Sequence, residues 1–184
     1  MQRLVALSRA PETKAATETK AAADAKAATD ATASDDAHAA QQVENLLASQ
    51  VQCVLATTAE DLTPATFLMA ASPCLRSVFV ATPLQARKAQ QMLERPGVSI
   101  LWDNRTGNLA DHGDGLLVTA SGHAAVAPRS EHESASARFL ARNPNMAGFL
   151  ASDGVAIFEI RVGRYEVVEG YGRPRQWQPS PTQW

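Results

Sequence analysis

The chain has 184 residues, of which 45% are hydrophobic, and its formal net charge at pH 7 is −2. This length suits one domain with an added tail, and this hydrophobic content supports a folded core. The nearly balanced charge argues against a nucleic-acid partner, which requires a basic surface. No stretch approaches the roughly 18 apolar residues of a transmembrane helix, and the apolar run at residues 4–7 is too short for a secretory signal. We therefore expect a cytoplasmic protein without a membrane partner.

The cysteines and histidines do not indicate a metal site. Cys53 and Cys74 are the two cysteines, and the four histidines are scattered along the chain. A zinc site needs about four ligands at close spacing, which these residues do not supply. Cys53 lies in an apolar run and is expected to be a small residue of the core. Both thiols are expected to be reduced.

The N-terminal segment differs in composition from the rest of the chain. Residues 11–35 consist almost entirely of Ala, Thr, Lys, Asp and Glu, without a large apolar side chain. Such a segment cannot bury a core, so we expect residues 1–35 to be a disordered or transiently helical tail. A membrane-active helix is excluded because no Leu, Phe or Trp lines a face. The folded domain is expected at residues 36–172, followed by a C-terminal tail at 173–184.

The first half of this domain is predicted to be one helix followed by three strands. Val43, Leu46 and Leu47 recur at helical spacing, which predicts a helix over residues 38–50. Short apolar runs separated by turn-like segments then indicate antiparallel strands. These strands are predicted at residues 51–58, 65–71 and 77–81.

A second helix is predicted over residues 83–94. Thr82 and Gln85 have the spacing of a capping box, and Pro83 suits the first helical position. Strands are expected at residues 98–102 and 116–127, on either side of a polar, glycine-rich loop. Gly122 within the second of these strands indicates a bulge or the close approach of another backbone.

The last part of the domain is predicted to contain a third helix and two final strands. Ser130 and Glu133 indicate the capped start of the helix, which ends before Pro144. A short helical piece is expected at residues 146–151. The final strands are predicted at residues 155–162 and 165–169, broken at Gly163. Hairpin-linked strands with helices inserted between them predict a mainly β, α+β fold: a closed antiparallel barrel with peripheral helices.

Two cations occur near the predicted start of the second helix. Arg87 and Lys88 would oppose the helix dipole there by roughly 0.3–1 kcal/mol each. An anion bound at that helix end would make the same charges favourable, because free N–H groups, the dipole and both cations would converge on it. A phosphate fits this description. On spacing alone, two solvated side chains on a surface helix remain the alternative.

Three runs in this region carry a family resemblance. They are VFVAT at residues 78–82, ARKAQQM at 86–92 and PGVSIL at 96–101. They resemble the pyridoxamine 5′-phosphate oxidase-like superfamily of FMN-binding split β-barrels. The resemblance implies a homodimer with FMN between the subunits and the FMN phosphate at Thr82, Arg87 and Lys88, with Ala81 as a further cofactor-binding residue. Later matches are Gly122 and the VEGYG run at residues 168–172.

The sequence also departs from the oxidase itself. The oxidase carries Arg and Lys in its second strand, whereas residues 65–71 contain neither. The flavin-contacting Gln expected near Leu117 is absent, and the substrate-binding signatures at the C-terminus are missing. These departures argue against pyridoxal phosphate synthesis.

A second candidate site lies in the polar loop after the fourth strand. The Asp-Asn-Arg run at residues 103–105 resembles a segment of flavin-binding and haem-utilisation-like relatives. The resemblance makes Asn104 and Arg105 candidate cofactor-binding residues, and Arg105 could offer its fork to a phosphate or a flavin carbonyl. An Asx-rich turn with a surface arginine is the alternative. His112 and His123 are interpreted as a solvated loop residue and a structural residue.

These features predict an FMN-dependent oxidoreductase that acts on an unidentified small molecule. The flavin would perform the redox chemistry, and no residue is predicted to be catalytic. The first alternative is a haem-binding or haem-degrading split barrel, although the C-terminal histidine of such relatives is absent after His132. The second alternative is a non-enzymatic flavin or tetrapyrrole binder.

Overall fold

The computed structural model describes residue 26 and residues 34–180. Contacts divide the chain into two compact units, Met1–His38 and Ala39–Trp184. Most of the expected N-terminal tail lies outside the described residues. Residues 34–49 are helical, which confirms the first predicted helix. No helix in the described part of the chain has the length and apolar character needed to cross a membrane.

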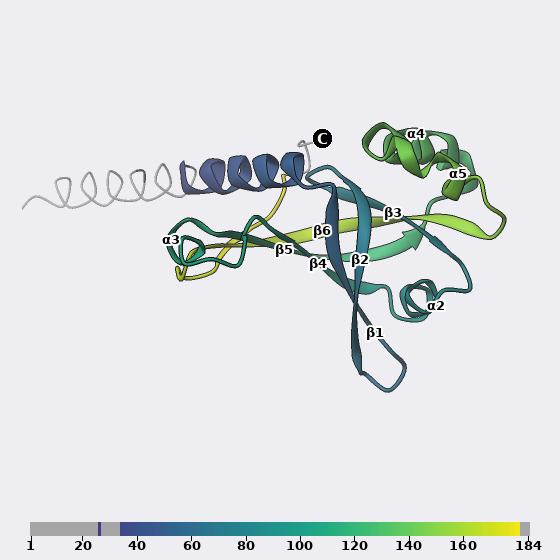
Figure 1. The fold of residues 1–184 in the computed structure, drawn as a ribbon, viewed down its shortest axis with the longest axis horizontal. Coiled ribbons are helices and arrows are strands. Elements are labelled where there is room, and N and C mark those ends of the chain that lie inside the picture. The colour runs from purple at the N-terminus through teal and green to yellow at the C-terminus, as the bar shows by residue number, and fades with distance from the viewer. Residues whose placement is uncertain (1–25, 27–33, 181–184) are drawn as a thin grey trace, which may run out of the picture. The chain divides into compact units, whose positions relative to one another are not determined.

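Six strands of the second unit form a closed antiparallel barrel (Figure 1). Neighbouring strands follow the order β3-β2-β1-β4-β5-β6, and pairing of β3 with β6 closes the barrel. Strand β7 extends the sheet beyond β6. The bounds are β1 (Gln52–Thr58), β2 (Pro64–Pro73), β3 (Ser77–Pro83), β4 (Gly97–Asp103), β5 (Leu116–Val126), β6 (Val155–Glu169) and β7 (Arg175–Trp177). The predicted α+β class with an antiparallel barrel is confirmed.

Alternation along the strands fills the barrel. In β1 and β4 every second residue is buried, as expected for strands with one face on a core. Cys53 is one of the buried residues, and burial raises the pKa of its thiol to about 12. Trp102 and Tyr165 are among the largest fully buried side chains. Residues 39–49 add Val43 and two leucines to the same core.

At one end of the closed barrel, β2 and β3 separate and leave an opening. Only three residue pairs join these strands, from Ala71 opposite Val80 to Pro73 opposite Val78. Residues 64–70 of β2 therefore pair with β1 alone, and residues 81–83 of β3 pair with β6 alone. The chain leaves β3 at this opening and enters α2 (Arg87–Glu94).

The predicted start of this helix is wrong by four residues. Thr82 and Pro83 are still in β3, opposite Ala156 and Val155 of β6. Helix α2 begins at Arg87, and its N-cap Ala86 provides no side-chain hydrogen bond. The capping box is not used because the ladder with β6 also holds Pro83, the predicted first helical residue, in the strand.

The two predicted final strands are one strand, β6, which crosses Gly163 without a break. Its pairing with β5 shifts register between Ser121 and Gly122. A Cβ atom added at Gly122 would lie 2.4 Å from the backbone oxygen of Arg161. The sequence expectation of a bulge and a close backbone approach at Gly122 is confirmed.

Short helices connect the strands. They are α3 (Asp111–Asp114), the 3-10 turn η1 (Arg129–Glu131), α4 (His132–Arg142), the 3-10 turn η2 (Pro144–Met146) and α5 (Ala147–Leu150). The Ser130 capping box is also wrong, because η1 occupies these residues and α4 begins only at His132. The predicted short helical piece corresponds to η2 and α5.

The C-terminal segment from residue 173 contains β7. Trp177 in this strand is 5% exposed and stacks on Tyr165, with ring centroids 5.4 Å apart. The Trp177 ring therefore packs on the barrel of its own chain.

Candidate functional site

The first turn of α2 lies beside the opening between β2 and β3. Lys88 reaches β2, where its Nζ lies 4.9 Å from the centroid of the Phe67 ring. Arg87 is exposed and lines a hollow of about 550 Å³ together with the β1–β2 turn. No acidic residue occurs in this first turn. Lys88 of this first turn therefore lies against β2 at the opening, whereas Arg87 lies beside the β1–β2 turn.

The polar groups of the β1–β2 turn partly offset the charge of Arg87. Asp61 lines the same hollow, and its pKa is lowered mainly by the hydrogen bond from the Thr63 backbone N–H, with a smaller contribution from Arg87. No ion pair within 4.0 Å links the two side chains in the described part of the chain. Lys88 and the helix terminus consequently carry the larger share of the unopposed positive potential.

Thr82 and Ala81 end β3 at the same opening, and their side chains point in opposite directions. Thr82 is fully buried, and its Oγ1 has no hydrogen-bond partner among the described residues. Alternation along β3 places it on the barrel face, together with Val80. Ala81 faces the second apolar cluster, which includes Phe139 of α4. Only the backbone of Ala81 is therefore available to a ligand.

A second buried polar group lies at the α2 end of the barrel. Thr57 Oγ1 of β1 donates a hydrogen bond of 2.6 Å to Oε1 of Gln91 in α2. Both residues are buried. This pair holds α2 against the barrel, and no local pattern predicts it because the two residues are 34 positions apart.

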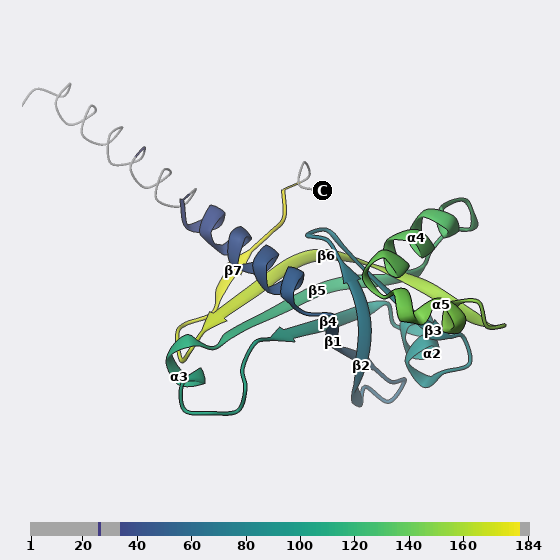
Figure 2. The same ribbon diagram turned by 45° about the horizontal axis from the view of Figure 1, so that its top comes forward.

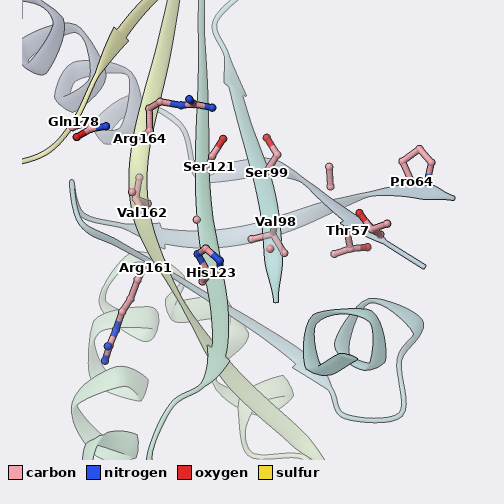
Figure 3. Close-up of a pocket in the computed structure, with 15 residues that line it drawn as sticks. Thr57, Pro64, Val98, Ser99, Ser121, His123, Arg161, Val162, Arg164 and Gln178 are labelled. Carbon is pink, nitrogen blue, oxygen red and sulfur yellow. The ribbon is translucent and has the colours of Figure 1, made fainter. Parts of the chain in front are cut away.

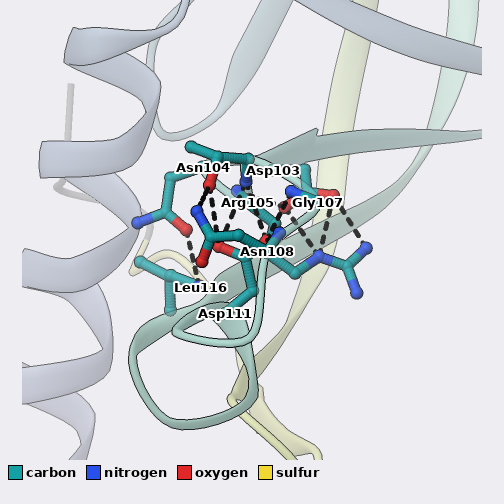
Figure 4. Close-up of polar contacts among 8 residues, drawn as sticks. Asp103, Asn104, Arg105, Gly107, Asn108, Asp111 and Leu116 are labelled. Carbon is teal, nitrogen blue, oxygen red and sulfur yellow. Dashed lines mark hydrogen bonds and ion pairs between the residues drawn. The ribbon is translucent and has the colours of Figure 1, made fainter.

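The loop after β4 is organised by its own carboxylates (Figure 4). Arg105 donates from Nε and Nη2 to both oxygens of Asp103, at 2.7–2.9 Å. This ion pair lowers the pKa of Asp103. Asp111 accepts backbone N–H groups from residues 106–108, and these hydrogen bonds lower its pKa. Oδ1 of Asn104 accepts the N–H of Leu116 at 2.7 Å.

The two predicted parts of the cofactor site do not meet within one chain. Strand β4 begins three residues after the end of α2, and Asn104 and Arg105 follow its far end. The seven residues of β4 span about 20 Å at 3.3 Å per residue. Figures 1 and 2 both show α2 and the α3 loop at opposite ends of the sheet. In addition, Asp103 already occupies the guanidinium fork of Arg105.

The structure also contains a surface cleft of about 680 Å³ that the sequence analysis missed. It lies over β1, β4, β5 and β6 and includes His123 and Arg164 (Figure 3). Among the described residues, no three His, Cys, Asp or Glu side chains gather into a metal-binding group. The nearest sequence signal for the cleft was Gly122, which lines it.

Comparison with solved structures identifies the fold. No protein-family model and no curated protein matches the chain. A protein from Clostridium acetobutylicum related to general stress protein 26, of the pyridoxinephosphate oxidase family, superposes with a TM-score of 0.57 at 10% identity. The match covers 74% of this chain and 92% of that protein. This chain has the pyridoxamine 5′-phosphate oxidase-like split-barrel fold.

Other split barrels superpose on the chain as well. General Stress Protein 26 from Bacillus anthracis has a TM-score of 0.57 and 17% identity, over 77% of this chain and 99% of that one. A heme-binding protein from Mycobacterium smegmatis has a TM-score of 0.69 and 20% identity, over 76% of this chain. The chain spans 57% of the length of the mycobacterial protein. At these identities the likeness establishes the fold.

Proposed function

We propose that this split barrel is a flavoprotein that binds FMN, with the phosphate at the start of α2. The observation that carries the proposal is the pair Arg87 and Lys88 in the first turn of a helix that opens onto the gap between β2 and β3. A phosphate at that position would accept hydrogen bonds from the free N–H groups of the first turn and from both side chains.

The residues around the gap fit a phosphate. The first turn of α2 contains no carboxylate, and the buried Thr82 hydroxyl has no partner in the described structure. A buried hydroxyl without a partner costs free energy, which a ligand oxygen or a bound water would recover. Lys88 would lift from the ring of Phe67 toward the phosphate. Its present contact with the ring is worth only about 0.5–1 kcal/mol.

Bound FMN would supply two-electron redox chemistry, which supports assignment as an oxidoreductase of a small molecule. The chain would hold the phosphate through Arg87 and Lys88, and the buried Thr57–Gln91 hydrogen bond would keep α2 in place. Proteins with this fold include the Clostridium acetobutylicum protein of the pyridoxinephosphate oxidase family.

A flavin-affinity measurement tests the phosphate site. The Arg87→Gln, Lys88→Gln double variant should bind FMN about 10- to 100-fold more weakly, because charge-assisted contacts are lost. Riboflavin lacks the phosphate, so its affinity should be the same for both proteins. The matched control is Arg129→Gln, Arg173→Gln, which removes the same charge from exposed positions. Wild-type FMN affinity in the first double variant would overturn the proposed site.

We also propose that the protein is a homodimer, with the second subunit packed on an apolar row at the outer face of β2, β1 and β4. Leu68, Val54 and Leu101 form one cross-strand row on that face of β2, β1 and β4. Leu68 is 67% exposed, which is unusual for a strand leucine within an apolar row. A stable interface here would bury more than about 1,200 Å² in total.

A homodimer would also complete the cofactor site. Asn104 and Arg105 lie far from α2 of their own chain, and a partner subunit could bring its copies of these residues to the flavin. Light scattering should give a dimer for the wild type and a monomer for Leu68→Glu. The control Leu93→Glu, at a 51% exposed position on α2, should remain a dimer. A wild-type monomer with FMN bound would refute the shared site.

Haem binding is the second candidate function. The mycobacterial protein that superposes on this chain is described as heme-binding, and His123 is an exposed histidine within a cleft. Histidine is a common axial ligand of haem iron. The absorption spectrum of the reconstituted protein separates the two candidates, because flavin bands and the Soret band of haem do not coincide.

A further inference from the structure

We propose that the cleft over β1, β4, β5 and β6 binds a small organic anion, whose carboxylate or phosphate is held by Arg164. The cleft is about 680 Å³ in volume, which is within the range of small-molecule sites. None of the residues assigned to FMN lines it. The proposal therefore does not use the residues proposed to hold FMN, and it is an alternative to haem at His123 in the same cleft.

The bulge in β6 is the reason that Arg164 faces the cleft. Strict alternation from the buried residue Ile160 would place Arg161 and Gly163 outside and Arg164 inside the barrel. The register shift adds one residue to β6 opposite the step from Ser121 to Gly122. Arg164 consequently faces outward, and Tyr165 takes the buried position. Bulges that reorient one side chain are common beside binding sites.

Polar groups of the neighbouring strands complete an anion site. Arg164 pairs in register with Ser121 of β5, which pairs with Ser99 of β4. In Figure 3 the Arg164 side chain extends across β5 toward Ser121, and His123 lies further along the same strand. The Arg164 guanidinium makes no hydrogen bond or ion pair with another residue of the described part of the chain. An oxyanion could therefore accept two hydrogen bonds from the Arg164 guanidinium without displacing a protein carboxylate.

The charges around the cleft favour an anion. Arg161 also lines the cleft, but its Nε lies 3.3 Å from Oε2 of Glu159. Glu159 also accepts the hydroxyl of Ser77, so its carboxylate is already engaged. Glu166 follows on β6 opposite Thr119 and does not line the cleft. Among the described residues that line the cleft, Arg164 is therefore the arginine without an ion-pair partner.

Glycines leave room for a flat ligand body. A Cβ atom at Gly97 would meet nothing within 4 Å, and one at Gly163 would meet only the Ser121 oxygen at 3.8 Å. Both positions line the cleft, so backbone forms part of its floor. A planar ring could lie on this floor, with its anionic group at Arg164. The ligand class is therefore a small aromatic carboxylate or phosphate.

Titration of the isotope-labelled full chain by NMR tests the inference. The probes are benzoate and phenyl phosphate, with neutral benzyl alcohol as the comparison. Both anions should shift the amide resonances of Ser121, His123 and Arg164 with a Kd in the millimolar range or tighter, and benzyl alcohol should not. The two anions distinguish a carboxylate ligand from a phosphate ligand. The absence of saturable shifts with both anions would overturn the proposal.

Variants separate this site from other cations of the protein. Arg164→Gln should weaken binding of the preferred anion at least about tenfold, because a charge-assisted contact is lost. Arg129→Gln, at an exposed position outside the cleft, is the matched control and should retain the wild-type Kd. Gly97→Leu should also weaken binding by filling the floor, without contact to any ionised group. Unchanged affinity in Arg164→Gln, or shifts confined to α2, would refute the assignment even if FMN binds as proposed.

Discussion

Replacing Gly122 by alanine adds only one methyl group, but it should destabilise the barrel strongly. The new Cβ would lie 2.4 Å from the Arg161 oxygen, 3.0 Å from the Arg161 carbonyl carbon and 3.1 Å from Cγ2 of Ile160. Cβ atoms in real structures essentially never approach another atom closer than 3.0 Å, so β5 and β6 must separate locally by at least 0.6 Å. The atom in the way is backbone, which cannot move aside as a side-chain end can.

The cost follows from the ladder that this separation disrupts. Overpacking in a closely packed site costs about 1–3 kcal/mol, and weakening one adjacent backbone hydrogen bond adds about 1 kcal/mol. We therefore expect Gly122→Ala to lower the free energy of unfolding by about 2–4 kcal/mol. At roughly 2–4 °C per kcal/mol, the melting temperature should fall by about 4–16 °C.

Gly97 supplies the matched control. It lines the same cleft and pairs with the residue after Gly122, but a Cβ there would meet nothing within 4 Å. Gly97→Ala should be neutral or stabilising by about 0.4–1 kcal/mol, through the lower entropy of its unfolded chain. Urea denaturation monitored by circular dichroism compares the two variants. If Gly122→Ala is as stable as Gly97→Ala, the close backbone approach at Gly122 is not a feature of the folded protein.

Three further predictions follow from buried or charged hydrogen-bonding groups. Arg142→Met should lower the free energy of unfolding, measured by urea denaturation, by about 2–4 kcal/mol. The reason is that Nη2 of Arg142 donates to the carbonyls of Leu47, Ala48 and Gln50 at the end of the helix of residues 34–49. A smaller loss than that of Arg129→Met would contradict this capping role. Thr57→Val should lower the free energy of unfolding by about 1–3 kcal/mol, because the Gln91 oxygen would stay buried without a donor. In a double-mutant cycle, adding Gln91→Leu should recover part of this loss. Additive losses would show that the two groups do not interact. The α3 loop should lose order in acid. Folding lowers the pKa of Asp111 below its ordinary value of 3.8, so the ionised carboxylate stabilises the loop fully above that value. This stabilisation of the loop is lost as the pH falls through the lowered pKa. Peak positions of the amides of residues 106–108 in an NMR pH titration measure this, and an Asp111→Asn variant with the same acid transition would refute it.

Local patterns in the sequence determined most of the secondary structure. Alternating burial along β1 and β4 follows directly from their apolar runs, because side chains of a strand alternate between its faces. The helix of residues 34–49 is equally local, since its apolar residues recur at helical spacing. The close approach at Gly122 was also predictable, because a glycine inside a strand often marks a bulge or a place where another backbone comes close.

Pairing between distant segments decided the rest. The capping signal at Thr82 is a valid local preference, but seven residue pairs between β3 and β6 outweigh a cap worth about 1 kcal/mol. The outward turn of Arg164 depends on a register shift between β5 and β6, which only the assembled ladder defines. Composition and periodicity therefore determined which residues form strands. The register between strands far apart in the chain decided which side chains reach a site. The physical reason is that each backbone N–H and C=O must find its partner across the sheet.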